Sequence, residues 1–248
     1  MIVTNESYRE AIRERTSAED EDITTVRNGP DLARIHAIRP DERLRERASC
    51  VLGYVGTLGY HDGLDYLLRS LATLVDELGA VDLRCYVMGD GEALPGLRLQ
   101  AKDLGLDDVV TFTGWLGDDD LRRHLSSIDI GVVPDPSNPY NDRSTMIKVA
   151  EYMAVGKPLV AFDLPEHRVT AGDAALYATP NDERDFALKL KELIDAPGLR
   201  EAMGVYAIER VHECLDWRYS AAWLLEAYAK LNAVPQLEGQ ARASTGRP

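Results

Sequence analysis

Short apolar runs alternate with amphipathic segments from residue 51 onward, and this alternation constrains the fold more than any other feature of the chain. The apolar runs, which predict strands, are residues 51–55, 83–88, 109–112, 130–133 and 158–162. The amphipathic segments, which predict helices, are residues 63–78, 92–104, 118–126 and 145–155. The repeated strand–helix order therefore predicts an α/β fold, a doubly wound parallel sheet with helices on both faces.

The segments on either side of this pattern predict less regular structure. After residue 162 the chain becomes largely helical, with helices expected at 182–194, 198–211 and 217–231, and the polar tail 233–248 is expected to be disordered. Before residue 51 we expect a helix at 5–15, a strand at 23–26, a turn at 28–30 and a charged linker at 39–49. We therefore divide the chain into residues 1–50, a domain at 51–232 and a tail at 233–248.

Composition excludes several classes of partner. The 248 residues carry a formal net charge of −14, which repels a polyanion and argues against nucleic acid. There is no basic amphipathic face for a membrane surface, no apolar stretch of transmembrane length and no signal-peptide core at the N-terminus. The three cysteines lie far apart and are expected to be free thiols, Cys50 and Cys85 buried. These features predict a cytoplasmic protein.

Polar loops follow the predicted strands at residues 56–63, 89–92, 114–117 and 134–144. Ligands of parallel sheets bind where such loops converge, at the carboxyl ends of the strands. The glycines at 53–59 lack the spacing of a dinucleotide fingerprint, and on their own a tight strand-to-helix turn explains them better. The three aspartates at 118–120 begin a predicted helix, so stabilisation of the helix start is a better explanation than a metal site.

The segment 142–163 carries the strongest functional signal. Ser144 is expected to cap the helix that follows, so that the N–H groups of Thr145 and Met146 form a diphosphate site at the helix start. Lys148 and Glu151 would share one helical face, a cation for phosphate and a carboxylate for two ribose hydroxyls. Spacing alone favours equally a surface Lys–Glu pair of little energetic consequence.

A resemblance decides between these interpretations. The motifs GTLGYHDGLDYLL, GDGEALPGL, VVTFTGW, IDIGVVPDP, KVAEYMAVGKPLVAFD and ALYATPND occur in this order. Together they resemble the C-terminal, donor-binding domain of family 4 glycosyltransferases, which are retaining enzymes of the GT-B fold, in a subgroup linked with bacterial polysaccharide synthesis. The resemblance spans residues 51–231. It implies a Rossmann-like domain with a helical C-terminal extension, preceded at 1–50 by the end of an N-terminal domain and an interdomain linker.

The resemblance implies a donor site formed by Gly56, Thr57, His61, Gly89, Trp115, Ser144, Thr145, Met146, Lys148 and Glu151. Trp115 would stack on the base, with packing beneath its loop as the alternative. Two family features differ here: the first of two paired glutamates is Arg143, and a basic pair in the first loop is replaced by Thr57 and Asp62. Arg143 and Lys148 are then the candidates to stabilise the leaving group. The donor substrate is a nucleotide-diphosphate sugar, and neither a cofactor nor a metal is implied.

The acceptor site of such enzymes lies on a second Rossmann-like domain, for which residues 1–50 are too few. The chain is therefore expected to be the donor-binding half of a transferase that acts on a glycan or lipid-linked acceptor. A non-catalytic remnant acting as a partner subunit is the alternative, and a nucleotide-sugar epimerase fits less well. The predicted helix 217–231 carries an apolar stripe, with exposure expected near Trp223 and Leu224, which favours self-association or a protein partner.

Overall fold

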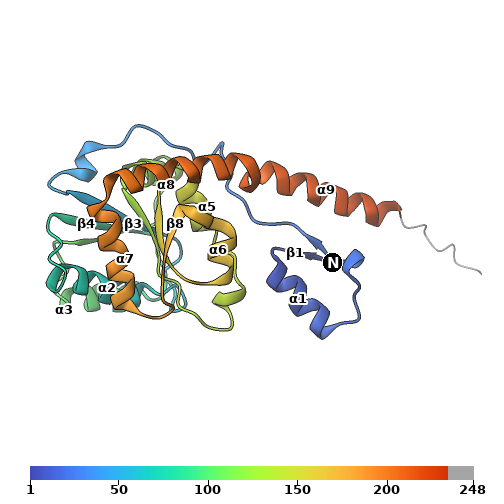
Figure 1. The fold of residues 1–248 in the computed structure, drawn as a ribbon, viewed down its shortest axis with the longest axis horizontal. Coiled ribbons are helices and arrows are strands. Elements are labelled where there is room, and N and C mark those ends of the chain that lie inside the picture. The colour runs from blue at the N-terminus through green and yellow to red at the C-terminus, as the bar shows by residue number, and fades with distance from the viewer. Residues whose placement is uncertain (234–248) are drawn as a thin grey trace, which may run out of the picture.

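A six-stranded parallel sheet forms the centre of the computed structural model, which describes residues 1–233 (Figure 1). Its strands are β3 (Cys50–Val55), β4 (Leu83–Met88), β5 (Val110–Gly114), β6 (Ile130–Val133), β7 (Leu159–Phe162) and β8 (Ala175–Ala178), in the spatial order β5-β4-β3-β6-β7-β8. The strand order reverses between β3 and β6, and this switch point of a doubly wound sheet is where ligands bind. The predicted fold class is confirmed.

Helices cover both faces of the sheet. The helices of the domain are α2 (Leu64–Asp76), α3 (Leu94–Asp103), α4 (Asp118–Ser127), α5 (Ile147–Ala154), α6 (Pro165–Ala171), α7 (Glu183–Asp195) and α8 (Pro197–Arg210). Successive residues of β3 enter different cores: Leu52 and Tyr54 pack with α2, α3 and α7, whereas Val51 and Val55 pack with α4 and α5. Every residue of β3 is buried, as expected for a strand covered on both faces.

Two elements were not predicted. The helix α6 and the strand β8 follow β7, where the sequence predicted only a change to helical structure. Both are short, seven and four residues, and β8 is an edge strand with half-buried Leu176 and Tyr177. A short edge strand gives a weak periodic signal because little of it is buried. The thiols of Cys50 and Cys85 are free and buried as predicted, and burial raises the pKa of each to about 12.

The first 25 residues form a small unit beside the sheet domain. Strands β1 (Ile2–Val3) and β2 (Thr24–Thr25) pair in parallel around α1 (Glu6–Arg15), whose N-cap Asn5 accepts a hydrogen bond from the Tyr8 amide. The last helix, α9 (Trp217–Ala233), runs away from the sheet domain toward this unit and contacts β2 (Figure 1). The predicted tail 233–248 lies outside the described residues, except for its first residue.

Two short connections complete the fold. The predicted turn at 28–30 is not present; instead Gly29 lies against the Leu215 carbonyl, where an added Cβ would approach to 2.2 Å. The predicted linker 39–49 contains a 3₁₀ turn, Glu42–Arg45, and is fastened to the end of α4. There the Asp41 amide donates to Ser127 Oγ, and Arg45 binds Asp129 at 3.0 Å.

Candidate functional site

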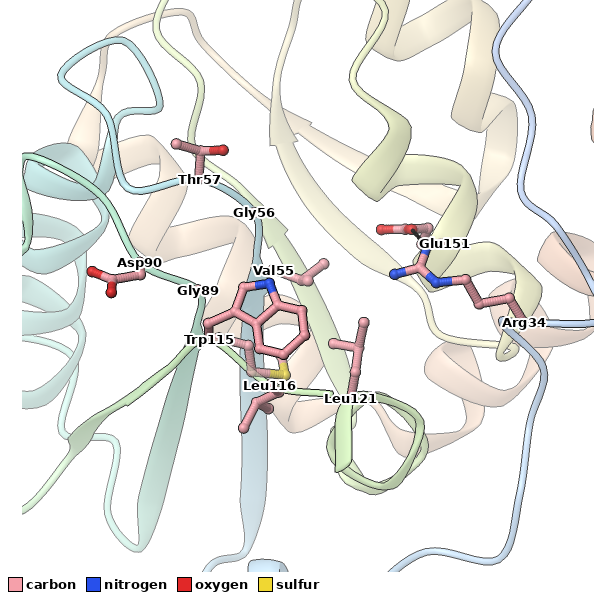
Figure 2. Close-up of a pocket in the computed structure, with 11 residues that line it drawn as sticks. Arg34, Val55, Gly56, Thr57, Gly89, Asp90, Trp115, Leu116, Leu121 and Glu151 are labelled. Carbon is pink, nitrogen blue, oxygen red and sulfur yellow. Dashed lines mark ion pairs between the residues drawn. The ribbon is translucent and has the colours of Figure 1, made fainter. Parts of the chain in front are cut away.

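A cavity of about 220 Å³ opens at the carboxyl ends of β3 and β4, beside the switch point (Figure 2). The residues that line it are Arg34, Val55, Gly56, Thr57, Met88, Gly89, Asp90, Trp115, Leu116, Leu121 and Glu151. They come from the ends of β3 and β4, the loops after β3, β4 and β5, the helices α4 and α5, and one segment before the sheet domain. Five residues predicted for the donor site are among them: Gly56, Thr57, Gly89, Trp115 and Glu151.

Two glycines allow the loops after β3 and β4 to meet at the cavity. Gly56 has φ +149° and Gly89 has φ +147°, a backbone conformation that disfavours residues with a side chain. A Cβ on Gly89 would lie 1.8 Å from the carbonyl oxygen of Gly56. The two loops therefore approach each other through main-chain atoms, which form this part of the cavity wall.

Trp115 forms an exposed aromatic wall of the cavity. It follows the end of β5 and is 77 % exposed. This exposure shows that the alternative role, packing beneath its own loop, is wrong. Figure 2 shows the indole above Leu116, with Leu121 of α4 farther along the same side. An exposed aromatic face beside apolar side chains can accept a planar ring by stacking.

Glu151 supplies a buried carboxylate on the opposite side of the cavity. It lies on α5, is 9 % exposed, and its Oε1 is 3.7 Å from Nη1 of Arg34. Burial raises the pKa of Glu151, against the opposing charges of Arg34 and Lys148. The surface Lys148–Glu151 pair considered from spacing is not formed, because Glu151 faces Arg34 and Lys148 binds other groups.

Arg34 was not predicted as a site residue. Figure 2 shows its side chain extending from the connection before the sheet domain toward Glu151. Its Nε donates to Asp118 Oδ1 at 2.9 Å, so one of the aspartates expected only to begin a helix also holds this arginine. Arg34 is the single basic side chain among the residues that line the cavity. Nothing in the local sequence distinguishes it from the other arginines of the first 50 residues.

The predicted helix start at Ser144 is wrong. Helix α5 begins at Ile147 with Met146 as its N-cap, and Ser144 instead follows a 3₁₀ turn, Asn141–Arg143. The Ser144 hydroxyl donates to the Tyr140 carbonyl at 2.8 Å. A local carbonyl therefore satisfies the group that was expected to cap the helix.

Lys148 lies in a buried polar cluster and does not line the cavity. Its Nζ donates to both carboxylate oxygens of Asp135, at 2.9 and 3.0 Å, and to the Tyr54 hydroxyl at 3.2 Å. Asp62, which occupies a position usually basic in the resembling family, is 3.7 Å away. Burial lowers the pKa of Lys148, but the charges of Asp135 and Asp62, the Tyr54 side chain and the hydrogen bond to Asp135 together outweigh burial, so the pKa is raised. The lysine charge is thus already neutralised by protein carboxylates.

The remaining predicted residues lie outside the residues that line the cavity. His61 is exposed, its ring 6.0 Å from that of Tyr140. The Arg143 carbonyl accepts from Asn5 at 2.8 Å, and the Thr145 hydroxyl binds Asn5 and Glu166. These contacts join the loop before α5 to the N-terminal unit. Met146 is half-buried at the start of α5.

Comparison with known proteins agrees with this geometry. Residues 49–196, more than half of the chain, match the family model described as Glycosyl transferases group 1. The chain belongs to this family. The matched residues contain β3 to β8 and every cavity residue except Arg34.

The curated relatives that this chain matches are about twice its length. It is 27 % identical over 244 residues to a D-inositol 3-phosphate glycosyltransferase of Rhodococcus erythropolis, covering 93 % of the chain and 53 % of the relative. It is 29 % identical over 168 residues to the lipopolysaccharide core biosynthesis glycosyltransferase LpsE of Rhizobium meliloti, covering 66 % of the chain and 46 % of that relative. The chain therefore spans about half the length of the curated relatives it matches.

Solved structures share the fold. HepE of Anabaena, solved in complex with UDP, superposes with a TM-score of 0.76 at 18 % identity, over 92 % of this chain and 63 % of that one. A sucrose-phosphate synthase from Thermosynechococcus elongatus superposes with a TM-score of 0.74 at 19 % identity, over 94 % of this chain and 58 % of that one. The chain thus has a GT-B-like α/β fold. Of the helices in the part of the chain that the structure describes, none combines the length and apolar character that crossing a membrane requires.

Proposed function

We propose that this chain binds the nucleotide-diphosphate-sugar donor of a retaining, family 4 glycosyltransferase that transfers the sugar to a glycan or lipid-linked acceptor. The observation that carries the proposal is the buried carboxylate of Glu151, which faces a cavity at the switch point of the sheet. A carboxylate can accept hydrogen bonds from both hydroxyls of a ribose. Such a group is costly to keep in a buried place unless a ligand or partner uses it.

The cavity offers complementary chemistry for each part of a nucleotide. Trp115 would stack on the base, Glu151 would hold the ribose, and the backbone at Gly56 and Gly89 would face the diphosphate. Leaving-group charge must be stabilised by preorganised donors. Arg143 remains our candidate for this role, whereas the ion pair with Asp135 leaves Lys148 little charge to offer. Support also comes from HepE, which shares the fold and was solved in complex with UDP.

A non-catalytic partner subunit is the second candidate function. One observation that favours it is that Thr57 and Asp62 replace the two basic residues that the resembling family usually has in the first loop. Another is that Asp62 lies 3.7 Å from the buried ammonium of Lys148, where it adds negative charge. An epimerase of the same architecture has less support, because the family model and the named relatives are transferases.

We also propose that α9 contacts a second protein or a second copy of the chain. Trp223, Leu225 and Tyr228 are 45, 70 and 54 % exposed, while Ala227 is buried toward the N-terminal unit. The predicted exposure is found at Trp223, but Leu224 is only half-exposed and its neighbour Leu225 is the more open residue. Sedimentation velocity of the purified chain tests self-association, and a clean monomer at all concentrations would contradict the second-copy contact.

A thermal-shift screen with UDP-, GDP- and ADP-sugars tests the donor proposal. Binding to the native state raises the melting temperature, and the stabilisation grows with the logarithm of the ligand excess over Kd. We expect sugars of one nucleotide class to raise the melting temperature. If no nucleotide sugar shifts the melting temperature, donor binding is rejected. A donor-turnover assay then separates the candidates: the transferase proposal expects turnover once an acceptor domain is supplied, and the partner-subunit alternative expects binding without turnover.

A further inference from the structure

The turn that presents Arg34 to the cavity is rigidly built, although it lies before the family-model match. Asp31 Oδ1 accepts from the Ala33 amide at 2.9 Å, and its carbonyl accepts from the amides of Arg34 and Ile35 at 3.0 and 2.7 Å. The side chain of Ile35 is 1 % exposed and belongs to the core of the sheet domain. The backbone at Arg34 is therefore fixed relative to the cavity, so the arginine occupies a defined place in the site.

The Arg34 guanidinium bridges two carboxylates that come from different helices. Its Nε donates to Asp118 of α4 at 2.9 Å, and its Nη1 lies 3.7 Å from Oε1 of Glu151 on α5. The planar fork of arginine suits such a bridge, because one edge can bind Asp118 while another nitrogen faces Glu151. The arrangement joins the turn, α4 and α5 at one side of the cavity, and Figure 2 shows the part of it between Arg34 and Glu151.

We propose that Arg34 is a positioning residue, which Asp118 holds in place and which orients the ionised carboxylate of Glu151 for binding the ribose hydroxyls of the nucleotide. The inference rests on the proposed function and adds a residue to it. Glu151 has two neighbouring cations, Arg34 and Lys148, and Lys148 is bound by Asp135. Arg34 is thus the cation whose geometry sets the direction of the Glu151 carboxylate.

The alternative role for Arg34 is direct contact with the diphosphate. The two roles differ in which part of the nucleotide loses binding when Arg34 is removed. A positioning role acts through Glu151, so it affects the ribose. A phosphate contact affects the discrimination between a nucleoside diphosphate and the bare nucleoside.

The experiment is calorimetric titration of the full chain with UDP, 2′-deoxy-UDP and uridine. Wild type is compared with Arg34→Ala, Arg34→Lys and a control, Arg43→Ala, whose exposed side chain pairs with Asp41. We expect wild type to prefer UDP over 2′-deoxy-UDP by about tenfold, the contribution of one charged hydrogen bond. In Arg34→Ala this preference should fall to about twofold or less, in Arg34→Lys partly, and in the control not at all.

Each outcome has a distinct meaning. If wild type binds UDP but Arg34→Ala keeps the full ribose preference, or loses instead the preference for UDP over uridine, the positioning role is overturned and the proposed function stands. If wild type binds neither UDP here nor any nucleotide sugar in the thermal-shift screen, the proposed function fails and this inference fails with it. A second readout needs no ligand: NMR titration of ¹³C-labelled glutamate should show a higher Glu151 pKa in Arg34→Ala than in wild type, and an unchanged value contradicts the proposal.

Discussion

The ammonium of Lys148 lies 2.9 Å from Oδ1 and 3.0 Å from Oδ2 of Asp135, and both side chains are buried. The ion pair joins α5 to the loop after β6, next to the cavity. Removing one partner of a buried ion pair leaves the other charge desolvated and unpaired. We therefore assign this lysine mainly to the stability of the site.

Lys148→Met should lower the free energy of unfolding by about 3–5 kcal/mol, because Asp135 would remain buried without its partner. The double variant Lys148→Met/Asp135→Asn should recover part of this loss. Urea denaturation measures both, and Lys189→Met, at an exposed pair with Glu192, serves as the control, with an expected change within about 0.5 kcal/mol. A stable Lys148→Met chain that had lost only nucleotide binding would favour a phosphate contact instead.

Gly89→Ala should destabilise the protein by about 2–4 kcal/mol and abolish nucleotide binding. The new Cβ would meet the Gly56 carbonyl at 1.8 Å, at φ +147°. The matched control is Gly96→Ala in α3, where an added Cβ meets nothing within 4 Å and should be neutral or stabilise by about 0.5–1 kcal/mol. Denaturation and titration of both variants check this, and a Gly89→Ala chain of normal stability would show that the two loops need not meet.

Trp115→Ala should leave stability within about 0.5 kcal/mol, since the side chain is 77 % exposed, but weaken nucleotide binding by about 1–3 kcal/mol. The weaker binding would reflect lost stacking on the base. Tyr60→Ala is the control: Tyr60 is 72 % exposed and does not line this cavity. Equal nucleotide affinities of the wild-type and Trp115→Ala chains, by calorimetry, would remove the tryptophan from the site.

Glu151→Gln should be at least as stable as wild type at neutral pH. The folded state raises the pKa of Glu151 above its usual value, so the folded protein holds this proton more tightly than the unfolded chain. The stabilisation is present below the unfolded pKa and is lost as pH rises through the folded pKa. Denaturation midpoints of the two chains from pH 4 to 8 test this, and the stability advantage of Glu151→Gln should grow with pH across that window. A wild type that gains stability over Glu151→Gln with rising pH would contradict the assigned direction.

Much of the sheet could be predicted because its signals are local. The bounds of β4 and β6 match the predicted strands, since each is a mostly apolar run ended by a glycine or proline. Gly56, Gly89 and Trp115 follow β3, β4 and β5 and lie together at the carboxyl edge of the sheet. The strand order therefore predicted where the cavity would be.

The parts that could not be predicted depend on contacts between distant residues. Arg34 meets Asp118, 84 positions away, and no local pattern records that pair. The helix start was misplaced because Ser144 has an equally local partner in the Tyr140 carbonyl. Lys148 is bound by Asp135, a loop aspartate that no local pattern distinguishes from the other acidic residues.

Calorimetric titration of wild type and Glu151→Ala with UDP tests the central claim most directly, with Glu192→Ala as a surface control. We expect wild type and the control to bind alike and Glu151→Ala to bind more weakly by about 1–3 kcal/mol, through loss of charged hydrogen bonds to the ribose. Equal UDP affinities of the wild-type and Glu151→Ala chains would contradict the claim that this buried carboxylate is the centre of a nucleotide-sugar site.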